Sequence, residues 1–98
     1  MATRKNGKKQ YVIVRTYSAG VWFGALGARK GKEVALTEAR RIWRWFGANT
    51  CSELALHGLD QSRSKVAEPV SVDLTEAIEV IAAAPAAVAS IKGAKWAQ

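Results

Sequence analysis

Arginine and aromatic side chains crowd one short stretch of the sequence. Residues 40–46 read Arg-Arg-Ile-Trp-Arg-Trp-Phe, so three arginines and three aromatic residues occupy seven positions. A guanidinium group donates paired hydrogen bonds to phosphate oxygens, and an indole ring stacks on flat rings such as nucleic-acid bases. This combination favours the binding of a ligand that carries phosphates and planar groups.

A second set of residues with the same chemistry lies earlier in the chain, around a predicted turn at Ala19-Gly20. Together the two sets give the candidate ligand-binding residues, which are Arg15, Tyr17, Trp22, Arg40, Arg41, Trp43 and Trp45. The alternative is that the tryptophans fill the core, because a small domain needs large side chains there.

Other reactive residues are too few for a catalytic or metal centre. His57 is the single histidine and Cys51 the single cysteine, which disfavours a zinc or iron site. These two residues are six positions apart on one predicted helix, where side chains at that spacing do not face each other. Gly20, Gly24 and Gly27 do not precede a helix, as the glycines of a phosphate-binding loop would. We therefore expect a binding protein and not an enzyme, without a cofactor or a bound metal.

The positive charge is concentrated at the beginning of the chain. The formal net charge is +7, but residues 1–32 hold eight basic groups and no acid, whereas residues 33–98 hold seven basic and eight acidic groups. Residues 1–9 have almost nothing apolar to anchor them, which predicts a flexible basic arm. Its cations are Arg4, Lys5, Lys8 and Lys9. Such an arm attracts anions, nucleic acid among them, or serves only to keep the protein soluble.

Residues 10–98 are predicted to form a single domain, because a chain of 98 residues provides for one modest core. β-Branched and aromatic residues in alternation with polar ones predict strands. The predicted strands are residues 11–18, 21–26, 33–37, 70–74 and 76–81, of which the last two are alternatively one broken strand. Residues 40–46 fit helical spacing and strand alternation alike, and their aromatic content favours a strand.

Two short helices complete the predicted fold. Thr50 and Glu53 have the spacing of a capping box, which predicts a helix over residues 50–57. A proline suits the first position of a second helix over residues 85–92. The polar residues 59–69 predict a surface loop. The predicted fold class is α+β, a twisted antiparallel sheet of about five strands with two short helices.

Several blocks of the sequence carry a family likeness. They are Tyr11–Val21 with Gly24 and Leu26, Gly31–Val34, Ala39–Trp43 with Trp45, Gly47 and Ala48, and Leu74–Glu79. Over residues 11–81 the chain resembles a family of small tailed-phage and prophage proteins of unknown function. The run Arg-Thr-Tyr-Ser-Ala-Gly-Val is fairly specific to that family. The resemblance implies phage origin and brings no activity with it.

Phage origin favours three roles. The leading hypothesis is a non-enzymatic protein that binds nucleic acid or a phosphate-rich nucleotide, including the sequestration of a host defence signal. The first alternative is a structural or assembly protein of the virion. The second is an inhibitor that binds a host defence enzyme.

The same observations indicate location and assembly. No run of eighteen apolar residues is present, so we expect no membrane partner. The single Cys51 and the lack of an apolar signal core favour the host cytoplasm, or the virion for a structural protein. We expect a homo-oligomer, in which Trp96 is a subunit contact, unless Trp96 anchors the sheet.

Overall fold

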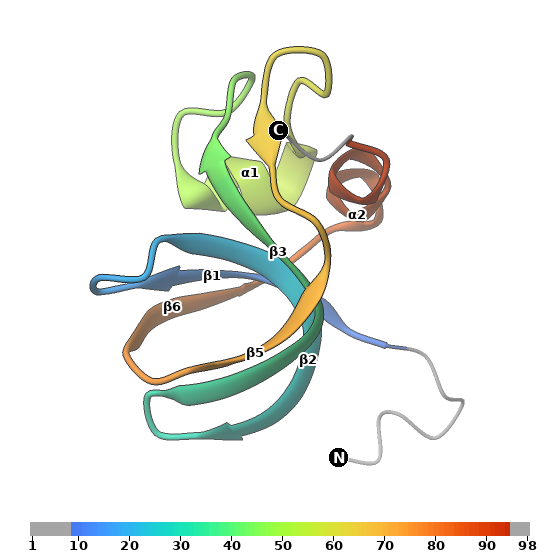
Figure 1. Ribbon diagram of the computed structural model, residues 1–98. Coiled ribbons are helices and arrows are strands. Elements are labelled where there is room, and N and C mark those ends of the chain that lie inside the picture. Colours follow the sequence, from blue (N-terminus) through green and yellow to red (C-terminus); the bar gives the residue numbers. More distant parts are fainter. Residues whose placement is uncertain (1–8, 95–98) are drawn as a thin grey trace.

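Within residues 9–94, which the computed structural model describes, six strands form one antiparallel sheet and two helices cover one of its faces (Figure 1). In chain order these elements are β1 (Tyr11–Thr16), β2 (Val21–Lys30), β3 (Glu33–Arg44), α1 (Cys51–His57), β4 (Lys65–Val66), β5 (Val70–Leu74), β6 (Ala77–Ala82) and α2 (Pro85–Lys92). The predicted α+β class is confirmed, although the described residues contain six strands and not about five.

The first two strands form the predicted β-hairpin. Thr16 closes the turn, because its Oγ1 donates to Gly20 O (2.8 Å) and accepts from the Ala19 N–H (2.8 Å). Gly20 has a φ of 89°, a conformation that glycine adopts without a steric penalty. The chain reversal predicted at this dipeptide therefore rests on local chemistry.

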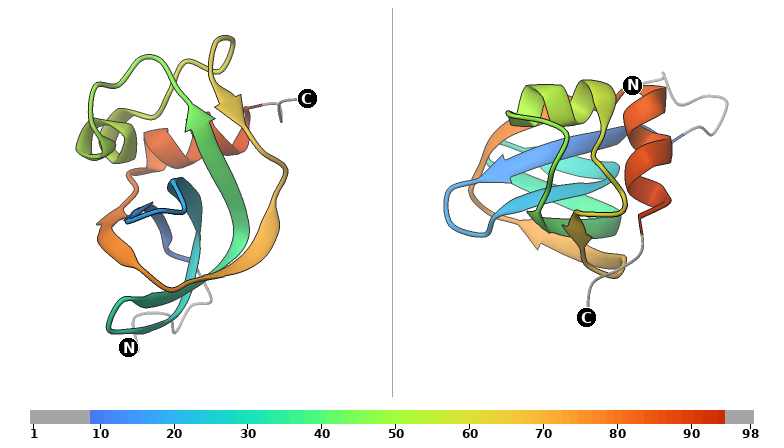
Figure 2. Two further views of the ribbon diagram at one scale, coloured as in Figure 1. Left: turned by 60° about the vertical axis from the view of Figure 1, so that its left-hand side comes forward. Right: turned by 90° about the horizontal axis from the view of Figure 1, so that it is seen from above.

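β5 and β6 are consecutive in the chain, yet they pair with different strands of the sheet. Only Thr75 and Glu76 separate them, but β5 pairs with β3 while β6 pairs with β1. The strand order is β4-β3-β2-β1-β6, with β5 beside β3. From their shared bend, β5 and β6 run along opposite sides of β1 and β2 (Figure 2, left). The sheet therefore curls into a partly open barrel.

The two faces of this curled sheet bury separate apolar cores, because side chains along a strand point alternately to either face. The inner core consists of Val12, Val14, Trp22, Val34, Leu36, Ala39 and Leu74. The outer core lies under the helices (Figure 2, right) and consists of Ile13, Phe23, Ile42, Leu54, Ala55, Leu59, Val66, Ile91 and Ala94. Consecutive residues of β1 thus serve different cores.

β3 is one long strand where two were predicted. It spans Glu33–Arg44 and bends at Glu38, whose φ of 52° is left-handed. Its pairing with β5 shifts register at this bend. One residue in this conformation interrupts the side-chain alternation, so the sequence pattern looked like two strands. The strand interpretation of residues 40–46 is confirmed as far as Arg44.

Both predicted helices are present. Thr50 caps α1, because its Oγ1 accepts from the Glu53 N–H (3.1 Å) while the Glu53 carboxylate accepts from the Asn49 N–H (2.8 Å). α2 begins at Pro85, where the absence of an N–H costs nothing. Neither of the described helices is long and apolar enough to cross a membrane.

β4 lies in the stretch predicted to be a surface loop, residues 59–69. Val66 is fully buried and pairs with Ile42 of β3. A strand of two residues contains a single apolar side chain here, so it shows no period in the sequence. Two predicted strands merge into β3 and β4 is added, so the described residues contain six strands.

Candidate functional site

Arg40 is buried against the end of α2 and is only 5% exposed. Its Nε donates to Ala67 O (2.8 Å), and its Nη1 donates to Ile91 O (2.9 Å) and Lys92 O (3.3 Å). The last two carbonyls belong to the final turn of α2, where the helix dipole is negative. Burial lowers the pKa of Arg40 from its usual value. These hydrogen bonds occupy the guanidinium, so Arg40 is structural and is removed from the candidate ligand-binding residues.

Trp22 fills the inner core, and the core-filling alternative is correct for this residue. Its side chain is 7% exposed, and its Nε1 donates to Ala19 O (3.1 Å). Arg41 is its partner in the β2–β3 pairing, and the Arg41 guanidinium carbon lies 4.7 Å from the centroid of the indole ring. The buried ring thus supports an exposed guanidinium.

Arg15 and Trp45 line a pocket of about 360 Å³ together with Glu79 and residues 49–52. The Arg15 Nε donates to the Glu79 carboxylate (3.1 Å), which compensates the positive charge of this pocket. Trp45 packs half-buried against the outer core. Burial and the nearby Glu79 raise the pKa of the Cys51 thiol, which favours the unreactive protonated form.

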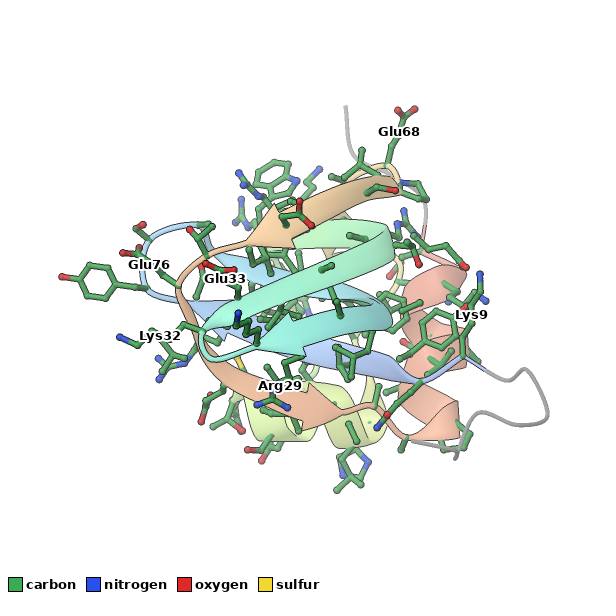
Figure 3. The ribbon with its side chains drawn as sticks, turned by 90° about the horizontal axis from the view of Figure 1, so that it is seen from below. Lys9, Arg29, Lys32, Glu33, Glu68 and Glu76 are labelled. Atoms are coloured by element: carbon green, nitrogen blue, oxygen red, sulfur yellow. The ribbon has the colours of Figure 1, made fainter. Side chains whose placement is uncertain are left out.

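Tyr17 extends from the β1–β2 turn and is 79% exposed. It lines a pocket of about 610 Å³ with Lys32, Glu76 and Ile78. Figure 3 shows Lys32 and Glu76 at the same end of the molecule. The charges of this pocket are mixed. Tyr17 therefore lines a different pocket from Arg15 and Trp45.

Exposed cations gather along the last part of β3 and the neighbouring β4. We term this group the cationic edge, which consists of Arg41, Arg44, Arg63 and Lys65. Arg44 and Lys65 are opposed partners in the β3–β4 pairing. Like charges in such a pair repel each other. An anion that binds between them is favoured for that reason.

The Phe46 ring contacts two of these cations. The guanidinium carbon of Arg63 lies 4.2 Å from the centroid of the Phe46 ring, and that of Arg44 lies 5.7 Å from it. The loop that carries Arg63 folds back here, because the Asp60 N–H donates to Phe46 O (2.8 Å) and the Phe46 N–H donates to Ser64 Oγ (3.0 Å). Contacts of this kind at exposed sites stabilise by about 0.5–1 kcal/mol each.

The nearest acidic residues in the sequence form no ion pair with the cationic edge, although the Asp60 carboxylate lies close enough to Arg63 for the two charges to attract each other. The Asp60 carboxylate accepts from Ser62 Oγ (2.8 Å) and the Ser62 N–H (3.0 Å), and these hydrogen bonds lower the pKa of Asp60. Glu68 points away from the sheet at a corner of the molecule (Figure 3). Among residues 9–94, no ion pair involves the edge. Apart from the attraction between Asp60 and Arg63, the cations of the edge are thus unpaired within this part of the chain.

Residues 9–91 match a family described as a domain of unknown function, DUF6948. The chain belongs to this family. No curated protein and no solved structure matches the chain. The predicted membership of a family of unknown function is confirmed, whereas phage origin stays a prediction.

Glu38 of the DUF6948 domain interacts with two lysines. Its carboxylate forms an ion pair with Lys9 and another with Lys92 (3.9 Å), and it accepts from the Tyr11 hydroxyl (3.0 Å). The hydrogen bonds from Lys9 and Tyr11 lower the pKa of Glu38. Lys9, the last cation of the predicted arm, is thus paired. The other arm cations lie outside the described residues and are Arg4, Lys5 and Lys8.

The β2–β3 hairpin of the DUF6948 domain carries further cations of the N-terminal third. Arg29 and Lys30 line a pocket of about 400 Å³ in which Glu33 and Asp73 also lie. Of the described cations in residues 1–32, Lys9 and Arg15 form ion pairs with acids of later strands, and Arg29 and Lys30 share a pocket with two further acids. The cationic edge comes from the part of the sequence whose net charge is close to zero.

Arg63 and Lys65 are not among the candidate residues that the sequence predicts. Their positions alternate with Ser64 and Val66, and the structure buries these two while it exposes the two cations. This alternation is the strand signal that could have found them. The polar hydroxyl of Ser64 concealed it, because a buried serine looks like a loop residue in sequence.

Groups that could support metal chemistry are not brought together. Within residues 9–94, no three His, Cys, Asp or Glu side chains are grouped so that they could hold a metal ion. The chemistry that the described side chains offer most clearly is anion binding at the cationic edge.

Proposed function

We propose that this DUF6948 domain is a non-enzymatic, phage-encoded protein that binds nucleic acid through the cationic edge. One observation carries the proposal: four exposed cations lie on adjacent elements, and among the described residues none forms an ion pair. Cations in such an arrangement neutralise consecutive phosphates and release the counterions bound there.

An extended polyanion suits this edge better than a free nucleotide does. A nucleotide gathers its phosphates at one point and requires a concave site with convergent groups. The cations of the edge instead lie along β3, β4 and the loop before β4. The pockets that hold the predicted residues Arg15 and Tyr17 contain Glu79 and Glu76, which repel phosphate.

Phage origin is the second part of the proposal. It is supported by the resemblance of residues 11–81 to small tailed-phage proteins, through the blocks that contain Arg15–Val21 and Ala39–Trp43. A phage protein of this kind acts on nucleic acid in the host cytoplasm. Recovery of the coding sequence within phage or prophage genomes tests this part.

The binding test reverses charge at the cationic edge and, as a control, at the β2–β3 hairpin, which lies at the opposite end of β3. In the test variant Arg44 and Arg63 are both replaced by Glu, and in the control Arg29 and Lys32 are replaced in the same way. Both variants change the net charge by the same amount. Affinity for a mixed-sequence oligonucleotide is measured by fluorescence anisotropy over a series of salt concentrations.

The expected result is a loss confined to the test variant. Each phosphate contact contributes roughly 0.7–0.9 to the slope of log affinity against log salt. The test variant should lose about two such contacts, so its slope should be correspondingly shallower than that of wild type. The control variant should keep the wild-type slope. Equal losses in the two variants, or a wild-type protein without affinity for the oligonucleotide, would refute the proposal.

A further inference from the structure

An exposed tryptophan lies within the cationic edge and adds a second kind of contact. Trp43 is 55% exposed, whereas Trp22 is buried and Trp45 is half-buried. Trp43 is not one of the buried or half-buried residues that make up the inner and outer cores. More than half of its surface is therefore open to a ligand.

A β-bulge explains why this ring faces solvent among cations. Ile42 pairs with Val66 and Arg44 pairs with Lys65, so Trp43 is an extra residue on β3 that β4 does not match. Strict alternation would have exposed Trp43 and buried Arg44. The bulge exposes both, and bulges re-aim side chains in this way next to binding sites.

The exposed ring is flanked by guanidinium groups on both sides along β3. Arg41 precedes Trp43 by two residues, which is about 6.6 Å along a strand, and Arg44 follows it directly. A nucleic-acid strand that lies across this segment would place its phosphates against the guanidiniums and a base against the indole.

We propose that the cationic edge binds single-stranded nucleic acid, with Trp43 as the ring on which an unpaired base stacks. This inference rests on the proposed function and deepens it. In a duplex the base faces are covered by their neighbours, so a surface ring meets only the backbone. In a single strand the base faces are free, and stacking on an aromatic side chain adds affinity with little dependence on sequence.

The test compares three nucleic acids of equal length under one salt condition. They are oligo(dT), a duplex, and a strand of the same backbone without bases. Wild-type protein is compared with Trp43→Ala and Trp43→Phe, and thermal melting confirms that each variant is folded. Fluorescence anisotropy of the labelled oligonucleotide reports affinity.

Wild-type protein should bind oligo(dT) about tenfold more tightly than it binds the duplex or the abasic strand. Trp43→Ala should lose this tenfold preference for oligo(dT) and should bind the duplex and the abasic strand with wild-type affinity. Trp43→Phe should keep most of the preference, because a phenyl ring still stacks.

The outcomes separate this inference from the proposed function. If no nucleic acid binds, the proposed function itself fails. If all three bind equally to wild-type protein, nucleic-acid binding stands and base stacking is refuted, whatever the variants do. If Trp43→Ala weakens binding to oligo(dT) and to the abasic strand equally, Trp43 contacts the backbone and the inference is again refuted.

Discussion

The two faces of β3 use adjacent arginines in opposite ways. On the face covered by the helices, Arg40 is buried and donates to three carbonyl oxygens. On the other face, Arg41 is exposed and rests on the Trp22 ring. Alternation along the strand separates the two side chains. The partners that each face offers, and not the residue type, decide which arginine is structural.

Replacement of Arg40 should have the largest effect on stability. Arg40→Ala removes the side-chain donor of the Ala67, Ile91 and Lys92 carbonyls, although Ile91 O still accepts from the Ala94 N–H (3.2 Å), and a buried group left unsatisfied costs about 1–3 kcal/mol. We expect a loss of about 2–3 kcal/mol in the free energy of unfolding, measured by urea denaturation. Arg40→Lys should fall between wild type and Arg40→Ala, since an ammonium group cannot reach all three oxygens. Wild-type stability in Arg40→Ala would contradict the structural role.

Replacement of Arg41 should show the reverse pattern. Arg41→Ala removes one exposed cation–π contact with Trp22, worth about 0.5–1 kcal/mol. Its main effect should be on nucleic-acid binding, where the salt slope should fall by roughly 0.7–0.9. Urea denaturation and salt titration of the same preparation measure both quantities. A loss of stability as large as that of Arg40→Ala would remove the distinction between the two faces.

At the bend of β3, in contrast to the cationic edge, the cations are paired: Glu38 forms ion pairs with Lys9 and Lys92. The pKa of Glu38 is lowered in the folded protein by Lys9 and Tyr11, so its charged form stabilises the fold above the unfolded value of about 4.5. This contribution is lost as the pH falls through the folded-state pKa. Glu38→Gln should therefore lower the melting temperature at neutral pH and match wild type in acid.

This should be the smallest of the three effects, because water screens an exposed ion pair. Glu68→Gln is the matched control, since the Glu68 side chain points away from the sheet (Figure 3) and its replacement should leave the melting temperature unchanged. A difference between Glu38→Gln and wild type that persists in acid would show that the carboxylate charge is not what stabilises the bend.

The elements that were predicted correctly depend on residues close together in the chain. Gly20 permits the hairpin turn, Thr50 and Glu53 cap α1 within one helical turn, and Pro85 begins α2. Each of these interactions is complete within a few residues. The sequence therefore contains all the information that such an element needs.

The candidate site could not be predicted in the same way, because its residues depend on distant partners. Arg40 is structural only because the end of α2, 51 positions later, lies against it. Arg15 loses its free charge to Glu79, which is 64 positions away. Lys65 joins Arg44 through the short pairing of β4 with β3, and Arg63 joins it through their shared contact with Phe46. Charge counted along the chain therefore does not reveal which of the described cations lie side by side in the fold.

The pairing of β1 with β6 constrains how the chain folds during synthesis. Arg15 and Glu79 are opposed in this pair although 64 positions separate them. Of the described strands, β1 leaves the ribosome first and β6 last, so one edge of β1 lacks its partner until translation of the domain is nearly complete. Pairing over such a distance is slow, and an unpaired strand edge promotes aggregation. The newly made chain is therefore most vulnerable just before its barrel closes.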